Sequence, residues 1–282
     1  MQKAVRKEAQ KQTYDTEAIK SQGVYELQQL FKYRFLIQNL ISRDLKVRYK
    51  RSALGFIWVM LNPLLTMLIT TFVFSQILRV HQADFPTYAL SGVLLFNLFS
   101  QGTVASMSNL TSNGPILSRI YIPPSVYVVS SIGSAMVNFC YALIPLAVII
   151  LVVDRIFPTF AWLLIIIPII EIAIFSTGIG LIVSALMVYF RDTFEIYTVL
   201  ITFFNYLTPL FYPTSALRVP ALINAEHFNP LFVFIDTFRS IIIFGVLPSS
   251  QELLTGVVYT VVGFAVGWVV FTRLERGFPY QF

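Results

Sequence analysis

Six long stretches of the chain are almost wholly apolar, and polar or charged residues gather between them. A helix needs about 20 predominantly apolar residues to cross a hydrocarbon layer about 30 Å thick. The pattern therefore predicts an all-α membrane protein with a transmembrane domain over residues 53–282. Its six expected spanning helices lie at residues 53–78, 88–107, 126–153, 160–189, 195–212 and 253–272.

A seventh apolar stretch, residues 229–245, is shorter and contains two charged side chains. Asp236 and Arg239 can pair on one helix face, but both would be costly at the centre of a bilayer. We therefore expect a re-entrant or interfacial helix here, with a shorter helix near residues 215–225, in an outer region over residues 214–250. The alternative, an ordinary extracellular loop, would not be this apolar.

The segment before the first span has the period of an amphipathic helix. At about 100° per residue, one arc of about 140° collects seven apolar side chains: Leu27, Leu30, Phe31, Phe35, Ile41, Leu45 and Tyr49. Lys32, Arg43, Lys46 and Lys50 lie on another side, as in a helix in the headgroup plane. Residues 24–52 are therefore predicted to form an interface helix, the alternative being a generic basic flank.

Three apolar residues break this pattern, namely Leu36, Leu40 and Val47, so the interface helix is also expected to touch protein. Residues 1–23 precede it as a polar tail of mixed charge. They do not resemble a secretory signal peptide, and we assign them no function.

The connection between the second and third expected spans contains a short bounded helix. Asn113-Gly114-Pro115 is a turn signal, residues 116–122 allow two helical turns at most, and prolines follow at 123 and 124. A helix of this length would expose Ile116, Leu117, Ile120 and Tyr121, which a partner protein could cover. The alternative is a connector held against the bilayer.

Composition narrows the function classes. Apolar residues make up 56% of the 282 residues and charged residues only 12%, which excludes a disordered chain and almost any soluble enzyme. Cys140 is the only cysteine, so no disulfide or cysteine–metal framework is possible, and we expect it to be a small core residue.

The formal charge of +6 is distributed unevenly along the chain. Twelve of the 20 basic residues precede residue 52, and four more fall in the other expected inner loops and the tail. An excess of Lys and Arg marks the cytoplasmic side of a membrane protein. Both termini are therefore expected in the cytoplasm, and the charge needs no nucleic-acid partner.

Chemistry within the membrane is sparse. The chain has no phosphate-binding glycine loop, zinc-protease motif or serine-hydrolase motif. Both histidines fall in expected outer loops, and Glu171 is the only acid well inside a span. A single carboxyl group within the membrane is weak support for an ion-coupled carrier or a membrane enzyme. The alternative role for Glu171 is a structural hydrogen bond to a Ser or Thr. A transporter that receives its energy from a partner protein fits the sequence better than an ion-coupled carrier.

Several motifs resemble one family. The run from Leu45 to Trp58, followed by Leu61-Asn-Pro-Leu64, is similar to the start of the membrane subunit of type-2 ABC exporters. Three further motifs also resemble this family and occur in the same order along the chain: Tyr189-Phe-Arg-Asp192, Thr208-Pro-Leu-Phe-Tyr-Pro213 and Asn229-Pro-Leu231. The branch that it resembles most exports O-antigen polysaccharide or wall teichoic acid.

The resemblance implies a homodimeric permease of the bacterial cytoplasmic (inner) membrane that binds two separate ABC ATPase subunits. The chain itself would hold no cofactor or metal and catalyse nothing, since ATP and Mg would bind the ATPase. The substrate would be a glycan or polyol phosphate chain on a polyprenyl diphosphate lipid. The coupling helix would comprise Pro115, Ile116, Leu117, Arg119, Ile120 and Tyr121. The outer gate would include Asn229, Pro230, Asp236 and Arg239.

Aromatic side chains are candidates for the substrate path, because sugar rings pack on aromatic faces. The candidates are Phe56, Trp58, Phe72 and Phe74 on the first span, and Phe203, Phe204, Tyr206, Phe211 and Tyr212 on the fifth. At about 100° per residue Phe204 and Phe211 share a face, which is the expected lumen side, whereas Tyr206 points away and is expected to pack on neighbouring helices. Ordinary lipid-facing or interfacial roles remain the alternative.

Three functions are therefore open: a polysaccharide exporter, a type-2 ABC exporter of a drug, antibiotic or lipid, and an ATP-independent carrier or membrane enzyme. Stable association with an ATPase subunit would exclude the third.

Overall fold

The computed structural model describes residues 22–50, 52, 54–74, 84–117, 122–212 and 228–281, and these residues form helices and connections without a strand. In chain order the helices are α2 (Gln22–Lys32), α3 (Arg34–Tyr49), η2 (Gly55–Ile57), α4 (Trp58–Phe72), α5 (Phe85–Ser112), α6 (Gly114–Leu117), α7 (Ser125–Val148), η4 (Ile149–Val153), η5 (Phe160–Ile165), α8 (Ile166–Tyr189), α9 (Thr193–Leu207), α11 (Pro230–Ile242), α12 (Ser250–Leu274) and η7 (Glu275–Tyr280).

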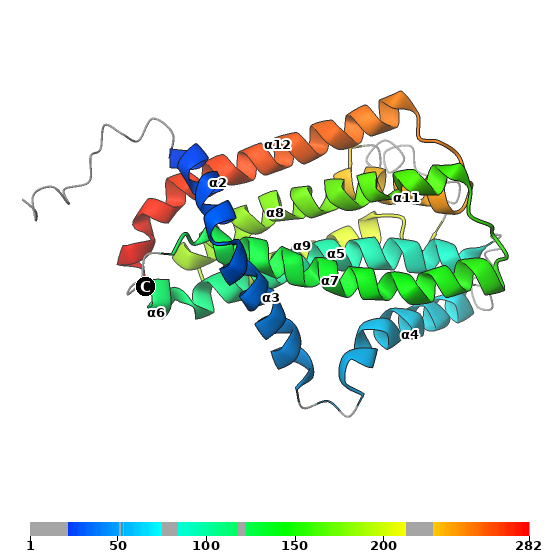
Figure 1. The fold of residues 1–282 in the computed structure, drawn as a ribbon, viewed down its shortest axis with the longest axis horizontal. Coiled ribbons are helices and arrows are strands. Elements are labelled where there is room, and N and C mark those ends of the chain that lie inside the picture. The colour runs from blue at the N-terminus through cyan, green and yellow to red at the C-terminus, as the bar shows by residue number, and fades with distance from the viewer. Residues whose placement is uncertain are drawn as a thin grey trace, which may run out of the picture.

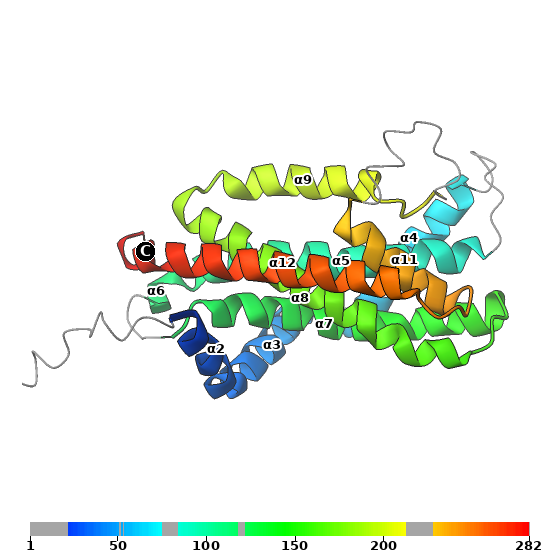
Figure 2. The same cartoon turned by 90° about the horizontal axis from the view of Figure 1, so that it is seen from above.

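Four long helices run along one axis of the bundle, namely α5, α7, α8 and α12 (Figure 1). With their short extensions they cover Phe85–Ser112, Ser125–Val153, Phe160–Tyr189 and Ser250–Phe278, and each is long and apolar enough to cross a membrane. They confirm four of the six predicted spans. The other two segments contain α4 and α9, which have 15 residues each; α9 lies along one side of the bundle (Figure 2).

The centre of the bundle is α5, which packs against α4, α7, α8 and α9. The last long helix, α12, instead packs mainly on α8, at a crossing formed by glycines. A Cβ on Gly267 would lie 2.1 Å from the carbonyl oxygen of Gly178, and one on Gly178 would lie 2.4 Å from that of Gly263. Glycines four residues apart let two apolar helices approach closely in this way.

The two ends of the bundle differ. At one end lie α2, α6 and the C-terminal turn (Figure 1). At the other end lies α11, where Asn229 bonds to Thr208 and Gly245 packs against Thr159. Thr159 comes before α8, which runs to the opposite end of the bundle, and Thr208 follows α9, which returns from there. Thr159 and Thr208 therefore lie at the same end. The 13-residue α11 therefore begins and ends at that end, and it is a helix rather than an extended loop. The shorter helix expected near residues 215–225 lies outside the described residues.

The expected single interface helix is in fact two helices, so that prediction is wrong in this respect. The chain bends at Tyr33 between α2 and α3, although backbone bonds continue through it. The bend turns Leu36 and Leu40 onto a core cluster with α5, α7 and α12, while Phe31 and Phe35 stay exposed. Of the three residues expected to touch protein, Leu36 and Leu40 do so, but Val47 is 68% exposed.

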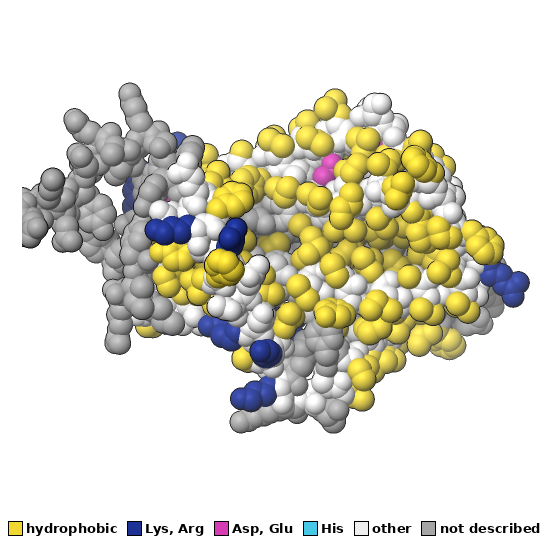
Figure 3. Space-filling view, viewed as in Figure 1, with side chains coloured by type: hydrophobic (Ala, Val, Ile, Leu, Met, Phe, Trp, Pro, Cys, Tyr) yellow, Lys and Arg dark blue, Asp and Glu magenta, His cyan; other side chains and the backbone are white. Residues whose placement is uncertain are grey.

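Apolar side chains cover most of the bundle face seen in Figure 3, and basic side chains gather near α2 and α3. This is the surface expected where lipid replaces water around the helices. Cys140 is exposed on α7. The expectation that it is a core residue is wrong, because its position faces outward from the contact between α7 and α5.

Candidate coupling and gate regions

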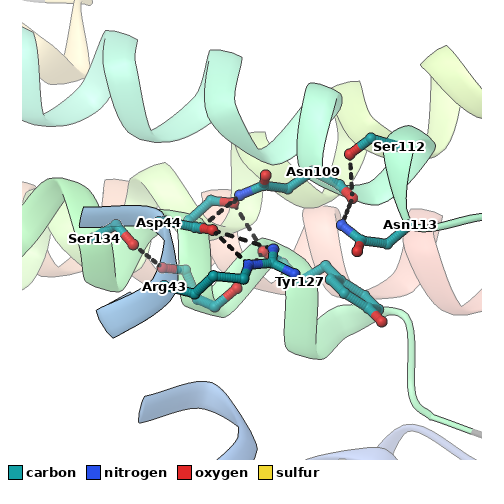
Figure 4. A network of polar contacts seen from close by, with 9 residues as sticks. Arg43, Asp44, Asn109, Ser112, Asn113, Tyr127 and Ser134 are labelled. Carbon is teal, nitrogen blue, oxygen red and sulfur yellow. Dashed lines mark hydrogen bonds and ion pairs between the residues drawn. The ribbon is translucent and has the colours of Figure 1, made fainter. Parts of the chain in front are cut away.

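A polar network joins three helices at the end of the bundle that carries α6 (Figure 4). The side-chain nitrogen of Asn109, on α5, donates to Oδ2 of Asp44 on α3 at 3.0 Å and to Oγ of Ser131 on α7 at 2.7 Å. Asp44 also accepts from Arg43 at 3.2 Å. A Cβ on Gly133 would collide with Ile41, so α3 also lies closely against α7.

The short helix α6 is attached directly to this network. Asn113, which is 7% exposed, donates its side-chain N–H to the carbonyl of Asn109 at 2.7 Å. The carbonyl of Asn113 in turn accepts from the backbone N–H of Leu117 at 3.2 Å. A displacement of α6 would therefore reach Asn109, and through it Asp44 on α3.

The structure corrects the expected exposure of one coupling residue. Leu117 is partly buried and packs against the core cluster of α3, α5, α7 and α12, because α6 follows directly on the end of α5. Pro115 is exposed. Arg119, Ile120, Tyr121 and the side chain of Ile116 lie outside the described residues.

The four basic residues predicted on the interface helix are all exposed: Lys32, Arg43, Lys46 and Lys50. The last three line a groove of about 830 Å³ on α3, together with Asn39 and Ser42. The groove is positively charged and faces away from the core, as a surface that meets anionic headgroups or a partner would.

A pair of acids joins α2 to the end of α12. Glu26 is 6% exposed, and its carboxyl group lies within hydrogen-bonding reach of that of Glu275. Burial raises the pKa of Glu26 above its usual range, although the hydrogen bond to Glu275 opposes this. One oxygen of each carboxyl group is buried without a partner. The contact therefore favours a state in which one proton is held between the two carboxyl groups.

At the opposite end, Arg239 holds together the segments around α11. Its guanidinium group is 2% exposed and donates to the carbonyls of Pro209, Leu210 and Tyr88 at 2.8–3.0 Å. It also lies 3.5 Å from the centroid of the Tyr88 ring. A Cβ on Gly92 would lie 2.4 Å from a guanidinium nitrogen, so that position has room only for glycine.

The carbonyls of Pro209 and Leu210 need donors because α9 ends at Leu207 and the chain continues without helical bonds. Tyr88 adds its hydroxyl, which donates to the carbonyls of Pro209 and Tyr212. Asn229 caps α11 and donates to Thr208 at 2.9 Å. We call this set, with Arg239, the outer clamp. Of the other predicted gate residues, Pro230 is the first residue of α11 and Asp236 is exposed on it.

The aromatic candidates fall into two groups. Trp58, Phe72, Phe203 and Tyr206 are exposed, whereas Phe204, Phe211 and Tyr212 are partly buried. Phe204 and Phe211, the pair expected to face the lumen, instead pack at the edge of the core within the single chain. The ring centroids of Phe211 and Phe74 are 6.1 Å apart. The side chain of Phe56 lies outside the described part of the structure.

The expectation that Tyr206 packs on neighbouring helices of its own chain is wrong. Tyr206 is 72% exposed, because α9 contacts α5 and α8 through the face that carries Phe204. The exposed face of α9 is an apolar stripe at helical spacing that comprises Ile196, Val199, Leu200, Phe203 and Tyr206. A second stripe lies on α4, at Leu65, Leu68, Ile69 and Phe72.

In the described part of the chain, the carboxyl group of Glu171 does not form the expected hydrogen bond to a Ser or Thr. One of its oxygens is buried without a partner, and the group lies against Gly256, where a Cβ would be 2.6 Å away. Thr260 bonds the backbone carbonyl of Glu171 instead. Asp44 and Asn109 were not identified from the sequence, and Asn113 was identified only as part of a turn. Their link to α6 depends on long-range contacts in the fold.

Comparison with known proteins places these features in a family. The family described as "ABC-2 type transporter" matches residues 36–243, which is most of the chain. The O-antigen export system permease protein RfbA of Klebsiella pneumoniae is 31% identical over 260 residues, covering 90% of this chain and 96% of that protein. The protein of the same name from Myxococcus xanthus is 28% identical, covering 81% and 88%.

A more distant relative, the polysialic acid transport protein KpsM of Escherichia coli, is 20% identical and covers 85% of this chain and 93% of its own. The three matches cover 81–90% of this chain and 88–96% of the relatives. The family match over residues 36–243 includes the polar network, α9 and α11. This chain belongs to the ABC-2 type transporter family of membrane proteins.

Proposed function

We propose that this chain is the membrane subunit of an ATP-driven exporter that moves a lipid-linked polysaccharide, of the O-antigen, capsule or teichoic acid type, across the cytoplasmic membrane. The observation that carries the proposal is the near full-length similarity to permeases named for O-antigen export and polysialic acid transport. The ATP would be bound and hydrolysed by a separate subunit.

In the proposed assembly all six apolar segments cross the membrane and both termini are cytoplasmic. The end that carries α2 and α6 then faces the ATPase, and α11 becomes a re-entrant helix at the outer surface. The basic groove of α3 supports this orientation, because Lys and Arg are enriched on the cytoplasmic side.

Two copies would form the transporter. The apolar stripes of α4 and α9 are exposed in the single chain and carry Phe72, Phe203 and Tyr206. In a dimer these stripes would face the second copy and line the conduit between them. Motion of the ATPases would enter at α6 and pass through Asn113 and Asn109 to α3.

The test combines export and association. Deleting the gene should remove a surface glycan while its lipid-linked precursor accumulates inside, and re-expression should restore the glycan. The purified chain should hydrolyse no ATP alone but associate with its ATPase. An unchanged surface glycan with altered drug or antibiotic tolerance would instead favour the other exporter class.

Cysteine labelling tests the orientation in a Cys140→Ala background. Ser112→Cys and Gln281→Cys should react only when the cytoplasm is accessible, whereas Val246→Cys should react from outside. All three positions are exposed in the structure. A position 281 that reacts from outside would contradict the proposed topology.

A further inference from the structure

A cavity of about 320 Å³ lies between α4, α5 and α7, apart from the coupling network and the outer clamp. Its size falls at the lower end of the range of small-molecule sites, about 300–1,000 Å³. Arg48, from the last turn of α3, and Trp58, from the first turn of α4, stand on its wall. The cavity is therefore next to the point where the chain enters its first long apolar segment.

The wall is unusually rich in amides for a site inside an apolar bundle. Each of the three helices contributes an asparagine, Asn62 from α4, Asn97 from α5 and Asn138 from α7, and α5 adds Gln101. The remaining wall residues that the structure describes are apolar, and none of them is an acid. Arg48 donates to Oε1 of Gln101 at 3.4 Å, so the guanidinium group lies beside the amides.

The side-chain amide of Asn138 indicates which hydrogen-bonding groups an occupant of the cavity would have to supply. The residue is 8% exposed, and among the described residues neither its side-chain oxygen nor its nitrogen has a hydrogen-bond partner. Buried amides without partners are destabilising and rare in folded proteins. An occupant that completes this site must offer a donor to Oδ1 and an acceptor to Nδ2 at the same time.

Adjacent hydroxyl groups meet this requirement, because each hydroxyl both donates and accepts. A fully ionised phosphate does not, since it offers acceptors and leaves Oδ1 without a donor. The exposed indole ring of Trp58 adds a flat apolar face beside the amides, suited to the C–H face of a sugar ring. Amides with an aromatic face therefore favour a saccharide over a phosphorylated headgroup.

We propose that the cavity between α4, α5 and α7 is a saccharide-binding pocket in which Asn138 and Asn97 bond to neighbouring hydroxyls of a sugar unit beside the Trp58 ring. The proposal rests on the proposed function, because the glycan being exported would supply the sugar. It adds a holding site within each subunit, separate from the conduit proposed between two copies.

The test measures stability and sugar binding in the same variants. The full chain with its ATPase is placed in phospholipid nanodiscs and titrated with methyl glucoside, mannoside, galactoside and rhamnoside, and with inorganic phosphate. We expect at least one glycoside to raise the thermal midpoint and to change the Trp58 fluorescence. The fluorescence change should be absent in Trp58→Phe. Inorganic phosphate should produce neither effect.

The decisive variant is Asn138→Leu, which replaces an unpartnered amide by an apolar group of similar size. It should raise the midpoint of the empty protein by a few degrees and weaken glycoside binding at least tenfold. Asn97→Leu, at a less buried position, should also weaken binding. Cys140→Ala, two residues from Asn138 on the exposed side of α7, should change neither quantity.

Three results would overturn the proposal: a lower midpoint in Asn138→Leu, glycoside binding of unchanged affinity in both asparagine variants, or a response to phosphate but to no glycoside. None of them bears on export itself. A transporter that restores the surface glycan without binding glycosides here would leave the proposed function intact, whereas one that binds glycosides but restores no glycan would contradict that function alone.

Discussion

The side-chain nitrogen of Asn109 lies 3.0 Å from Oδ2 of Asp44, although the two residues are 65 positions apart. The bond joins α3 to the end of α5, four residues before the turn into α6. Since α6 would meet the ATPase, the pair connects the expected coupling contact to the interface helix.

Removing the carboxylate should therefore loosen this connection. In Asp44→Ala the Asn109 amide keeps Ser131 as its acceptor, so we expect a loss of about 1.5 kcal/mol, typical of one bond to a charged group. The amount of polymer exported per ATP hydrolysed should fall clearly, whereas the thermal midpoint should fall only slightly. Ser112→Ala, whose hydroxyl makes only a 3.4 Å bond nearby, is the matched control. Equal losses in both variants would contradict the assigned connection.

The outer clamp predicts that Arg239 cannot be replaced by another cation. A lysine ammonium group lacks the planar guanidinium fork with which Arg239 donates to three carbonyls. Arg239→Lys and Arg239→Met should therefore both leave buried carbonyls without donors, at a cost of about 1–3 kcal/mol per carbonyl. The thermal midpoint of the purified protein should fall sharply in both. Gly92→Ala should act in the same direction, because its Cβ displaces the guanidinium group. Arg155→Lys, at an exposed arginine of the same end, should have little effect.

The contact between Glu26 and Glu275 predicts a stability that depends on pH. The pKa of Glu26 is raised in the folded chain, so this contact stabilises the fold fully at pH values below the usual pKa of a glutamate. Its contribution is lost as pH rises through the raised pKa. The thermal midpoint should fall from mildly acidic toward alkaline pH.

Glu26→Gln keeps the size of the side chain and removes its titration. We expect the variant to have a higher thermal midpoint than the wild type at alkaline pH. Its midpoint should also depend less on pH at lower pH values. Glu195→Gln, at an exposed acid on α9, should leave the wild-type dependence in place. A midpoint that rises with pH in the wild type would show that the acids are paired with cations instead.

Hydrophobic patterning was sufficient for the four long helices, because their apolar runs exceed the length of a span and end at turn signals. It also located α11 and the exposed basic side chains of α3. It was insufficient at Tyr33 and Leu117, where contacts with the core set the direction of a short helix. Leu36 and Leu40 were recognisable as exceptions to the amphipathic pattern, but their partners were not.

Long-range polar contacts were beyond the sequence for a different reason. Asp44, Asn109 and Asn138 are ordinary polar residues in apolar or mixed surroundings, and only the packing of α3, α5 and α7 gives them partners or leaves them without one. Arg239 was recognisable as a charge in an apolar helix. Its bonds to backbone carbonyls follow from the end of α9, which hydropathy does not locate.

The last prediction concerns which face of α9 meets the glycan. Phe203 and Tyr206 are 57% and 72% exposed and lie about 60° apart around the helix, whereas Phe204 packs against the core. Ala at both exposed positions should remove ring contacts with the sliding polymer, at about 1 kcal/mol each on the scale of aromatic pairs. Export should slow while the thermal midpoint of the single subunit changes little.

Phe204→Ala is the matched control, because it removes the same ring from the neighbouring position. It should lower the midpoint by leaving a gap at the edge of the core. Phe203→Leu with Tyr206→Leu separates ring contact from simple apolar surface, since it preserves the apolar stripe of α9 but supplies no aromatic face. If the leucine pair exports normally, the face serves packing between two copies; if it exports as slowly as the alanine pair, the rings themselves contact the glycan.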